Sequence, residues 1–358
     1  MDSKNVYSDG YRANKDDIAK LQHCYLGFQH AASIHAMAQL RIPEKLGTNL
    51  NCKRSAFDLA NEIGANPVYL ERVMHTLSLN GFFTEVPGYE IGKRVFQHNH
   101  LSLTMADPYI RDEVLLMGSL TFYRSYETLA DSIMTGQPQS GKALNCNNIW
   151  EFIQKNQDQE IIFSKAMTSI SIRHSPYLVS LIDFSKFDTI CDVGGSEGIM
   201  LFEILKLYPS VKNVINFDLP TVLQNLEGIH HRQLKLDQRY SEIQGSFFDG
   251  VPEADCYILK TVIHTLNDEQ SKLALMNISK SIRPKGKVFI IDLILDEESK
   301  LSEKYSSILD IHMLQLCGAK ERSIKEWKEL SNGTPLKFET IIYSNQINCQ
   351  NIIVYSME

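Results

Sequence analysis

The pattern of hydrophobic and polar residues differs between two parts of this chain. Up to about residue 185, apolar residues recur at helical spacing, first over 16–47 and again after residue 110, where a loop at 135–141 separates long helices. From residue 186 onward, short β-rich runs alternate with helical ones. The predicted strands are 188–193, 213–217, 241–245, 255–259, 287–293, 337–343 and 350–356, and the predicted helices are 199–207, 267–282 and 323–331.

Alternating strands and helices predict a parallel, doubly wound sheet with helices on both faces. The last two strands are joined only by the polar link 344–349, in which no helix fits, so we expect them to be antiparallel. The fold class expected for residues 186–358 is therefore α/β, a Rossmann-like domain with a C-terminal antiparallel strand pair. The region before it is expected to be mainly α.

Residues 55–97 have the outline of a winged helix. A helix over 55–63 opens with Ser55 as a capping residue, a turn and a second helix over 69–77 follow, and a hairpin over 81–91 bends at Pro87-Gly88. Winged helices often bind DNA through clustered basic residues, but residues 54–100 hold four Lys and Arg against five Asp and Glu. We therefore expect this module to serve packing or dimerisation.

Composition narrows the class of protein further. The 358 residues suffice for two domains, and the net charge of −7 argues against nucleic acid or an anionic membrane as partner. Seven cysteines occur without a C-x-x-C pair, which fits a reducing compartment, and no apolar run approaches the roughly 20 residues of a membrane span. With no apolar signal core at the start, the expected location is cytoplasmic.

The most informative stretch is 188–198, Asp-Thr-Ile-Cys-Asp-Val-Gly-Gly-Ser-Glu-Gly. A β-branched run ends in Asp192, and a turn containing Gly194, Gly195 and Gly198 leads into an apolar helix. Such a strand–turn–helix unit lets the backbone approach a ligand closely. Asp218, 20 positions beyond the last of these glycines, stands where a carboxylate holds a ribose. The unit is therefore interpreted as a nucleoside site.

Two common nucleotide-binding motifs are absent from this turn, and their absence narrows the nucleoside that it could bind. The dinucleotide fingerprint G-x-G-x-x-G would need glycines where Ser196 and Ile199 stand, and no phosphate loop of the G-x-x-x-x-G-K type occurs. An acid before the turn suits a ligand with a ribose and an amino-acid tail, because a carboxylate can bind the tail's ammonium. That describes S-adenosylmethionine; the alternative is an ordinary βα turn without a ligand.

With these motifs in place, the chain resembles class I S-adenosylmethionine-dependent O-methyltransferases, of the cation-independent caffeate and hydroxyindole type. The similarity runs from about residue 20 to the C-terminus. It rests on the winged-helix outline, Asp-Val-Gly-Gly-Ser-Glu-Gly (192–198), Phe-Asp-Leu-Pro (217–220), the run 254–264 ending in His264, Pro284-Lys-Gly-Lys-Val, and Gly-Ala-Lys-Glu-Arg-Ser-Ile-Lys-Glu-Trp (318–327). It implies a dimerisation domain over 1–110, a helical substrate-pocket region over 111–185 and a cofactor domain over 186–358.

The expected chemistry is methyl transfer to an aromatic hydroxyl. A phenol with a pKa near 10 is protonated at pH 7, so a base on the hydroxyl would contribute roughly 10²–10⁴-fold. The resemblance implies that His264 is this base, flanked by Asp292 and Glu321. An unperturbed histidine is largely neutral at pH 7 and free to accept the proton. This chain departs from the family in having Asp292 in place of a glutamate and His-Thr-Leu at 264–266 in place of His-Asp-Trp.

The cofactor contacts are carried over from the family motifs with two further departures. Ser196 replaces a glycine and can serve if its φ angle is ordinary, and Ser246-Phe247 replaces Asp-Met at the adenine. The residues expected to bind the cofactor are Asp192, Gly194, Gly195, Gly198, Asp218, Leu219, Ser246, Phe247, Lys260 and Ser171.

The expected substrate is a small hydrophobic aromatic hydroxyl compound: a phenol, an alkylresorcinol or another polyketide-type molecule. An apolar and methionine-containing lining suits such a molecule. The residues expected to line the pocket are Phe163, Met167 and Met313, with Phe122, Tyr123, Trp150, Phe152 and Leu316 as further candidates. No metal is expected, because no carboxylate cluster precedes the base.

A homodimer is expected, because the family dimerises through its N-terminal region and because Met37, Leu40, Ile42 and Leu46 offer much apolar surface. Two other functions stay open at this point. One is a nicotinamide-dependent dehydrogenase, which the broken fingerprint disfavours. The other is a catalytically altered S-adenosylmethionine-binding interaction protein, which the change after His264 would explain.

Overall fold

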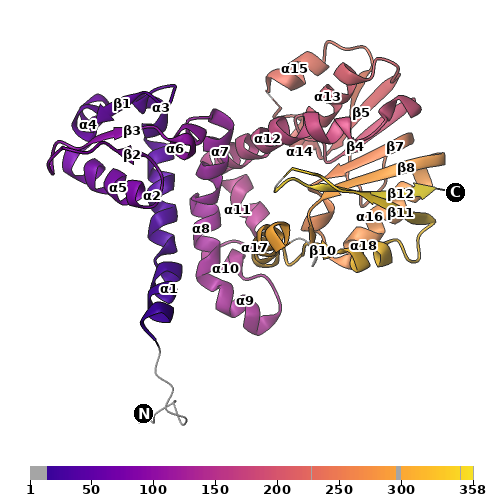
Figure 1. Cartoon of the computed structure of the whole chain (residues 1–358). Coiled ribbons are helices and arrows are strands. Elements are labelled where there is room, and N and C mark those ends of the chain that lie inside the picture. Colours follow the sequence, from indigo (N-terminus) through magenta and orange to yellow (C-terminus); the bar gives the residue numbers. More distant parts are fainter. Residues whose placement is uncertain (1–13, 227, 296–299, 347, 358) are drawn as a thin grey trace, which may run out of the picture. The chain divides into compact units, whose positions relative to one another are not determined.

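The computed structural model of this chain describes residues 14–226, 228–295, 300–346 and 348–357 (Figure 1). The chain forms two compact units, Met1–Ser119 and Leu120–Glu358. The three-part division predicted from the sequence stays a prediction.

The first unit is a set of helices around a small antiparallel sheet with the strand order β1-β3-β2. Ser55 caps α4 as predicted, because its hydroxyl accepts a hydrogen bond from the backbone N–H of Asp58 at 3.0 Å. The elements are α1 (Lys15–Tyr25), α2 (Gly27–Gln39), α3 (Ile42–Leu46), β1 (Lys53–Ser55), α4 (Ala56–Ile63), α5 (Pro67–Leu79), β2 (Thr84–Glu85), β3 (Val95–Gln97), α6 (His100–Met105) and α7 (Pro108–Met117).

Two sequence-based expectations for this unit are wrong. The second wing strand does not lie within 81–91 but at β3, so the hairpin loop is longer than the Pro87-Gly88 turn suggested. Of the four residues expected to offer dimer surface, only Leu40 is exposed (41%), whereas Met37, Ile42 and Leu46 are at most 2% exposed and pack in the core of the unit. The apolar character of the three buried residues is explained by their packing inside one protomer.

The second unit contains a seven-stranded sheet with the order β11-β12-β8-β7-β4-β5-β6. Strands β8, β7, β4, β5 and β6 are parallel, and β12 pairs antiparallel with both β8 and β11. The strands are β4 (Thr189–Val193), β5 (Asn213–Asp218), β6 (Tyr240–Gln244), β7 (Ala254–Lys260), β8 (Ile282–Asp292), β11 (Leu336–Ile342) and β12 (Asn351–Met357). The predicted parallel sheet and its antiparallel C-terminal pair are confirmed.

Helices cover both faces of this sheet (Figure 1). One hydrophobic core packs the sheet against α16 (Asp268–Ser281) and α18 (Ile324–Leu330), and the other packs it against α12 (Gln157–Ser180), α13 (Ile199–Leu207) and α15 (Ile229–Leu234). The buried strands are apolar on both faces, as parallel sheets require.

Shorter elements complete the second unit. A 3-10 turn, η3 (Ile263–Thr265), follows β7, and the two-stranded pair β9 (Ile294–Leu295) and β10 (Arg322–Ser323) flanks the long helix α17 (Lys300–Cys317). The others are α8 (Leu120–Ser125), η1 (Tyr126–Thr128), α9 (Leu129–Thr135), α10 (Ser140–Leu144), α11 (Ile149–Lys155), η2 (Phe184–Lys186) and α14 (Pro220–Leu223). Within the described ranges, no helix combines the length and the apolar character that crossing a membrane requires.

The wing of the first unit depends on one buried acid, which gives a test of the fold. Glu71 in α5 is 5% exposed and accepts hydrogen bonds from the backbone N–H groups of Gly92 (2.6 Å) and Arg94 (3.0 Å). Hydrogen bonds to a charged group contribute about 1.5–3 kcal/mol each, so Glu71→Ala should destabilise the wing by at least about 2 kcal/mol. Hydrogen exchange of the 86–95 segment should accelerate, whereas the exposed Glu90→Ala should leave it unchanged. Equal protection in both variants would contradict this role of Glu71.

Candidate active site

The predicted cofactor residues gather at one edge of the large sheet. Parallel strands end at the same edge, which is where open α/β sheets bind ligands. Asp192 lies in β4, Asp218 ends β5, Lys260 ends β7 and Asp292 ends β8. The structure therefore brings the expected cofactor acids and the expected catalytic acid to a single edge.

The turn after β4 needs its glycines for space and for backbone conformation. Gly194 has φ +75° and donates its N–H to the Phe217 carbonyl at 2.8 Å. A Cβ at Gly195 would come within 2.4 Å of Asn216 Oδ1, and one at Gly198, where φ is +71°, within 2.7 Å of Leu234. Side chains are excluded at these glycine positions, so the backbone there stays open to a ligand.

Ser196 does not have the ordinary φ angle that the sequence analysis required of it. Its φ is +50°, in the left-handed region that the replaced glycine would adopt without strain. Two contacts hold the residue there: its N–H donates to Asp218 Oδ2 at 2.9 Å, and its carbonyl accepts from Asn216 Nδ2 at 2.7 Å. The neighbouring strand thus compensates for the missing glycine.

The acids of this edge are buried without full compensation. Burial raises the pKa of Asp192 to about 7, although the positive charge of Lys260 works against this shift. Burial also raises the pKa of Asp218, which two backbone N–H groups oppose. Among the described residues Asn216 Oδ1 is buried without a hydrogen-bond partner. These groups fit a ligand that brings an ammonium and ribose hydroxyls.

Lys260 connects the cofactor edge with the expected catalytic residues. Its ammonium donates to Ser171 Oγ on α12 at 2.9 Å, which places these two predicted cofactor residues in contact. Burial lowers the pKa of Lys260, while the charges of Asp192 and Asp292 raise it. Lys260 is therefore a partly buried cation whose charge acts on both acids.

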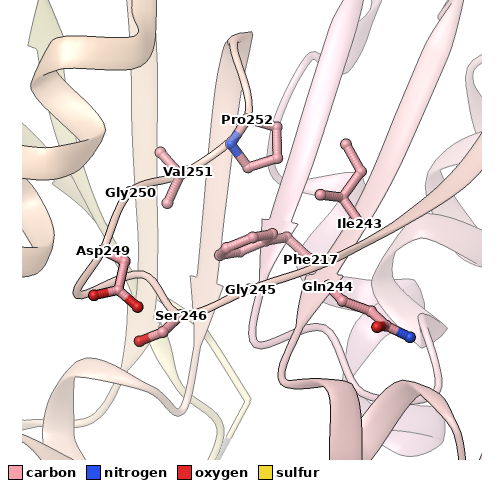
Figure 2. Close-up of a pocket in the computed structure, with 9 residues that line it drawn as sticks. All are labelled: Phe217, Ile243, Gln244, Gly245, Ser246, Asp249, Gly250, Val251 and Pro252. Carbon is pink, nitrogen blue, oxygen red and sulfur yellow. The ribbon is translucent and has the colours of Figure 1, made fainter.

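Ser246, one of the predicted adenine contacts, borders a cavity of about 460 Å³, whereas Phe247 is not among the residues that line it (Figure 2). Figure 2 shows the ring of Phe217 among Ile243, Val251 and Pro252, with Ser246 and Asp249 on the polar side. The ring of Phe247 contacts that of Phe248 at a centroid distance of 4.5 Å. Leu219, the remaining predicted contact, is 45% exposed and follows β5 directly.

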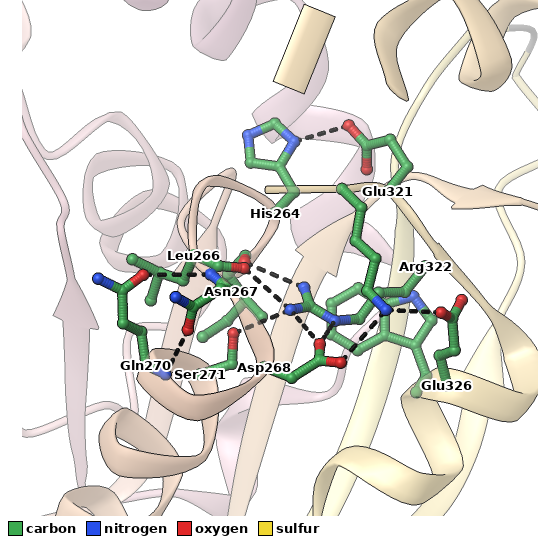
Figure 3. Close-up of polar contacts among 12 residues, drawn as sticks. His264, Leu266, Asn267, Asp268, Gln270, Ser271, Glu321, Arg322 and Glu326 are labelled. Atoms are coloured by element: carbon green, nitrogen blue, oxygen red, sulfur yellow. Dashed lines mark hydrogen bonds and ion pairs between the residues drawn. The ribbon is translucent and has the colours of Figure 1, made fainter. Parts of the chain in front are cut away.

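His264 lies in η3, just beyond the end of β7, with its ring held by a buried carboxylate (Figure 3). His264 Nδ1 lies 2.8 Å from Glu321 Oε1, and Glu321 is 1% exposed. The hydrogen bond fixes the proton on Nδ1 and leaves Nε2 as the acceptor when the ring is neutral. This is the arrangement of a base with an orienting acid.

Asp292 forms its hydrogen bond with the backbone of His264 and not with the ring. Its Oδ2 accepts the backbone N–H of His264 at 3.2 Å, and its Oδ1 is buried without a partner in the described part of the chain. Burial raises the pKa of Asp292 to about 7, although the charge of His264 opposes this. The missing methylene, relative to the family glutamate, thus coincides with a less direct contact.

The expectation that His264 is largely neutral at pH 7 does not hold in this environment. Burial by itself lowers the pKa of His264, but the carboxylates of Asp292 and Glu321 more than compensate and raise it to about 9. The charge of Lys260 opposes this rise but does not cancel it, so the imidazolium form is favoured at pH 7.

Arg322, which the sequence analysis did not select, holds the segment that carries His264 (Figure 3). Its side chain is fully buried, and its guanidinium donates to the carbonyls of Ile263 (3.1 Å) and Leu266 (2.9 Å) and to Asp268 Oδ1 (2.8 Å). It also lies 5.4 Å from the ring centroid of Trp327. An arginine directly after the matched Glu321 was the only sequence signal for this role.

The predicted substrate-pocket residues lie on two helices. Phe163 and Met167 are one turn apart on α12 and partly buried, and Phe163 packs edge-to-face with Trp150 at 5.8 Å. Met313 on α17 is 9% exposed. Their role in binding a substrate stays a prediction.

The comparisons with known proteins agree with this architecture. Residues 126–335 match the sequence profile of the O-methyltransferase domain family. Because the match covers more than half of the chain, the chain belongs to this family of class I enzymes, whose cofactor is S-adenosylmethionine. The family resemblance carried by the sequence motifs is confirmed.

The relatives of this chain include two proteins from Dictyostelium discoideum, described next. O-methyltransferase 9 is 32% identical over 231 residues, which are 63% of each chain, so this chain spans under two thirds of its length. Des-methyl DIF-1 methyltransferase A is 29% identical over 342 residues, 93% of this chain and 92% of that one. The structure of the mitomycin 7-O-methyltransferase MmcR is similar with a TM-score of 0.83 at 24% identity, covering 96% and 98% of the two chains, which confirms the fold.

The left-handed Ser196 gives a test of the turn. Ser196→Gly should raise the free energy of unfolding by up to about 1 kcal/mol, because glycine adopts a positive φ without strain. Gly198→Ala should do the opposite, since its Cβ would meet Leu234 at 2.7 Å and its φ is +71°. Urea unfolding of both variants checks the pair, and a loss of stability in Ser196→Gly would show that Ser196 is not strained.

Proposed function

We propose that this protein transfers the methyl group of S-adenosylmethionine to a hydroxyl of a small hydrophobic aromatic substrate, with His264 as general base. The observation that carries the proposal is the 2.8 Å hydrogen bond between His264 Nδ1 and the buried Glu321. In the neutral ring this bond leaves Nε2 to take the proton of the substrate hydroxyl.

His264 works as a base only when its ring is neutral. The carboxylates of Asp292 and Glu321 raise its pKa against the effect of burial, which makes the neutral ring a stronger base and a less populated one at pH 7. After proton transfer, the imidazolium is stabilised by the same two carboxylates. Arg322 keeps the ring in position by holding the carbonyls on both sides of it.

The cofactor supplies an electrophilic methyl group on a positively charged sulfonium. Asp192 would bind its ammonium, the Gly194–Gly198 turn would pass along its amino-acid end, and Asp218 would bind its ribose. Ser171 would border the amino-acid end, Ser246 and Phe247 would lie towards adenine, and Leu219 would be a further contact. The family resemblance puts Lys260 near adenine, but its hydrogen bond to Ser171 supports a place at the amino-acid end. The buried, incompletely compensated acids support this assignment.

For the substrate we propose a phenol, an alkylresorcinol or another polyketide-type aromatic. Phe163, Met167 and Met313 supply an apolar lining of the kind that flat hydrophobic molecules prefer. The name of one relative, Des-methyl DIF-1 methyltransferase A, records methylation of des-methyl DIF-1 by that protein. This likeness supports a small-molecule acceptor here.

We also propose a homodimer, supported by residues other than those predicted from the sequence. Helix α1 and the start of α2 expose Leu21 (64%), Tyr25 (56%) and Phe28 (55%), which form part of an apolar surface available to a second copy. The cytoplasmic location stays a prediction from the sequence.

Removal of the base tests the proposed mechanism. His264→Ala should lower kcat roughly 10²–10⁴-fold and leave S-adenosylmethionine affinity nearly unchanged, because the ring would act on the methyl acceptor. The readouts are turnover of a phenol panel and calorimetric titration with the cofactor. The exposed His100→Ala is the control and should retain full activity. Full turnover in His264→Ala would exclude His264 as the base.

The pH profile tests the role of Glu321. Since neutral His264 is the active form and its pKa is raised to about 9, kcat/KM of the wild type should increase with pH up to about 9. Glu321→Gln removes one of the charges that raise this pKa, so the rise should shift to lower pH while the plateau falls. Glu329→Gln, on an acid 56% exposed in α18, should keep the wild-type profile. An unshifted profile in Glu321→Gln would contradict the assigned coupling.

A further inference from the structure

A second histidine, His312 on α17, belongs to the same region and has no role in the reaction described above. It is 8% exposed, and its ring packs edge-to-face against Phe122 at a centroid distance of 4.5 Å. Its Nδ1 lies 2.9 Å from the hydroxyl of Tyr126, whose ring stacks on the imidazole at 6.1 Å. Two aromatic rings and one hydrogen bond therefore fix the orientation of this imidazole.

Helix α17 is attached firmly at the level of His312. Two residues before it, Asp310 accepts the backbone N–H of Glu321, the acid that orients His264, at 2.8 Å. Three residues after it, the fully buried Gln315 donates to the Ser125 carbonyl at 2.5 Å. The position of His312 is thus fixed by contacts of α17 with Glu321 on one side and with Ser125 of α8 on the other.

The two histidines are close enough to influence each other's charge. Burial lowers the pKa of His312 to about 4, and the positive charge of His264 adds to the effect. His312 therefore stays neutral at every pH at which His264 titrates. It cannot replace His264 as a base near pH 7, but it can form hydrogen bonds.

The contact with Tyr126 determines which nitrogen of His312 carries the proton. A phenol is a good donor and a weak acceptor, because its oxygen lone pair is delocalised into the ring, and imidazole nitrogen is a good acceptor. Burial raises the pKa of Tyr126, so its O–H stays protonated. The Tyr126 O–H then donates to Nδ1, and the proton of His312 lies on Nε2.

We propose that His312 is a specificity-determining residue of the methyl-acceptor site, whose Nε2–H donates a hydrogen bond to a second oxygen atom on the aromatic substrate. This inference rests on the proposed function. It narrows the substrate class to aromatic hydroxyl compounds that also carry an oxygen acceptor, such as an acyl carbonyl. The neighbouring Phe122 and Met313 would contact the apolar remainder of the ring.

The environment of His312 is better explained by recognition of a substrate than by packing alone. An imidazole among apolar side chains is costly unless its nitrogens are hydrogen-bonded. Tyr126 engages Nδ1, and the substrate acceptor is the partner that we assign to Nε2. A site built to donate a hydrogen bond rejects analogues that lack the acceptor much more strongly than an apolar pocket rejects a changed alkyl group.

The test compares two matched sets of methyl acceptors: the hydroxyacetophenone isomers, which carry a carbonyl, and the corresponding ethylphenols, which lack it. The variants are His312→Leu, which removes the donor, and His312→Gln, which keeps an N–H donor in a neutral side chain. Tyr126→Phe releases the control over the proton position. Ser307→Ala, on an exposed residue of α17, is the control that should behave as wild type.

The expected result is a change in substrate preference, not a general loss of activity. In His312→Leu, kcat/KM for the hydroxyacetophenones should fall roughly 10- to 100-fold, mainly through KM, while that for the ethylphenols changes little. His312→Gln should recover part of the preference, and Tyr126→Phe should lose part of it. Cofactor affinity should not change in any variant.

Two outcomes would overturn the inference in different ways. If His312→Leu lowers kcat/KM equally for both sets, or if wild type does not prefer the carbonyl compounds, His312 has a structural role only and the proposed function still stands. If wild type binds the cofactor but methylates no phenol of either set, the proposed function itself fails, and this inference falls with it. Thermal unfolding of each variant separates loss of folding from loss of recognition.

Discussion

The interaction on which the candidate active site depends is a buried group of charges around one short turn. Glu321 holds the ring of His264, and Asp292 holds its backbone N–H. Arg322, next to Glu321 in the chain, holds the carbonyls of Ile263 and Leu266 on either side. Burying such charges is costly, and removing any one partner would leave the others uncompensated. These contacts hold His264 in one position, as the proposed role of a base requires.

Two neighbouring strands each contribute part of the cofactor edge. Strand β4 supplies Asp192 and the turn, while β5 supplies Asn216 and Asp218, which hold the two sides of the Ser196 peptide. This support explains how the chain keeps the shape of a glycine turn after losing one glycine. The conformational cost of a left-handed serine, about 1 kcal/mol, is offset by two hydrogen bonds from residues already committed to the site.

Much of this architecture could be predicted from the sequence, because strand and helix periodicity are local signals. The run 188–193 and the helix 199–207 were correctly predicted, and the short polar link before β12 was enough to predict an antiparallel pair. What could not be predicted depends on contacts far apart in the chain. The φ angle of Ser196 is determined by β5, and the second wing strand is determined by pairing with β1 and β2.

The candidate site, too, depends on contacts between residues far apart in the chain, which the sequence could not predict. Motif resemblance selected His264, Asp292 and Glu321, which the structure brings together, but it could not reveal that Asp292 contacts a backbone amide. Arg322 and His312 have no sequence pattern of their own: Arg322 stands in a matched run without an assigned role, and no motif contains His312. Only their burial and their partners, Ile263 and Leu266 for one and Tyr126 for the other, distinguish them.

The electrostatics of the two halves of the site are linked through Lys260. The ammonium of Lys260 lowers the pKa of both Asp192 and His264. A hydrogen bond to Ser171 holds this ammonium in place. Any further positive charge that binds beside Asp192 acts on His264 in the same direction, because Coulomb interactions at this edge are weakly screened. The base would then lose its proton more readily with a cationic ligand bound than without one. By linkage, the neutral form of His264 would in turn favour the binding of that cation, so the protonation of His264 and the binding of a cation beside Asp192 would be coupled.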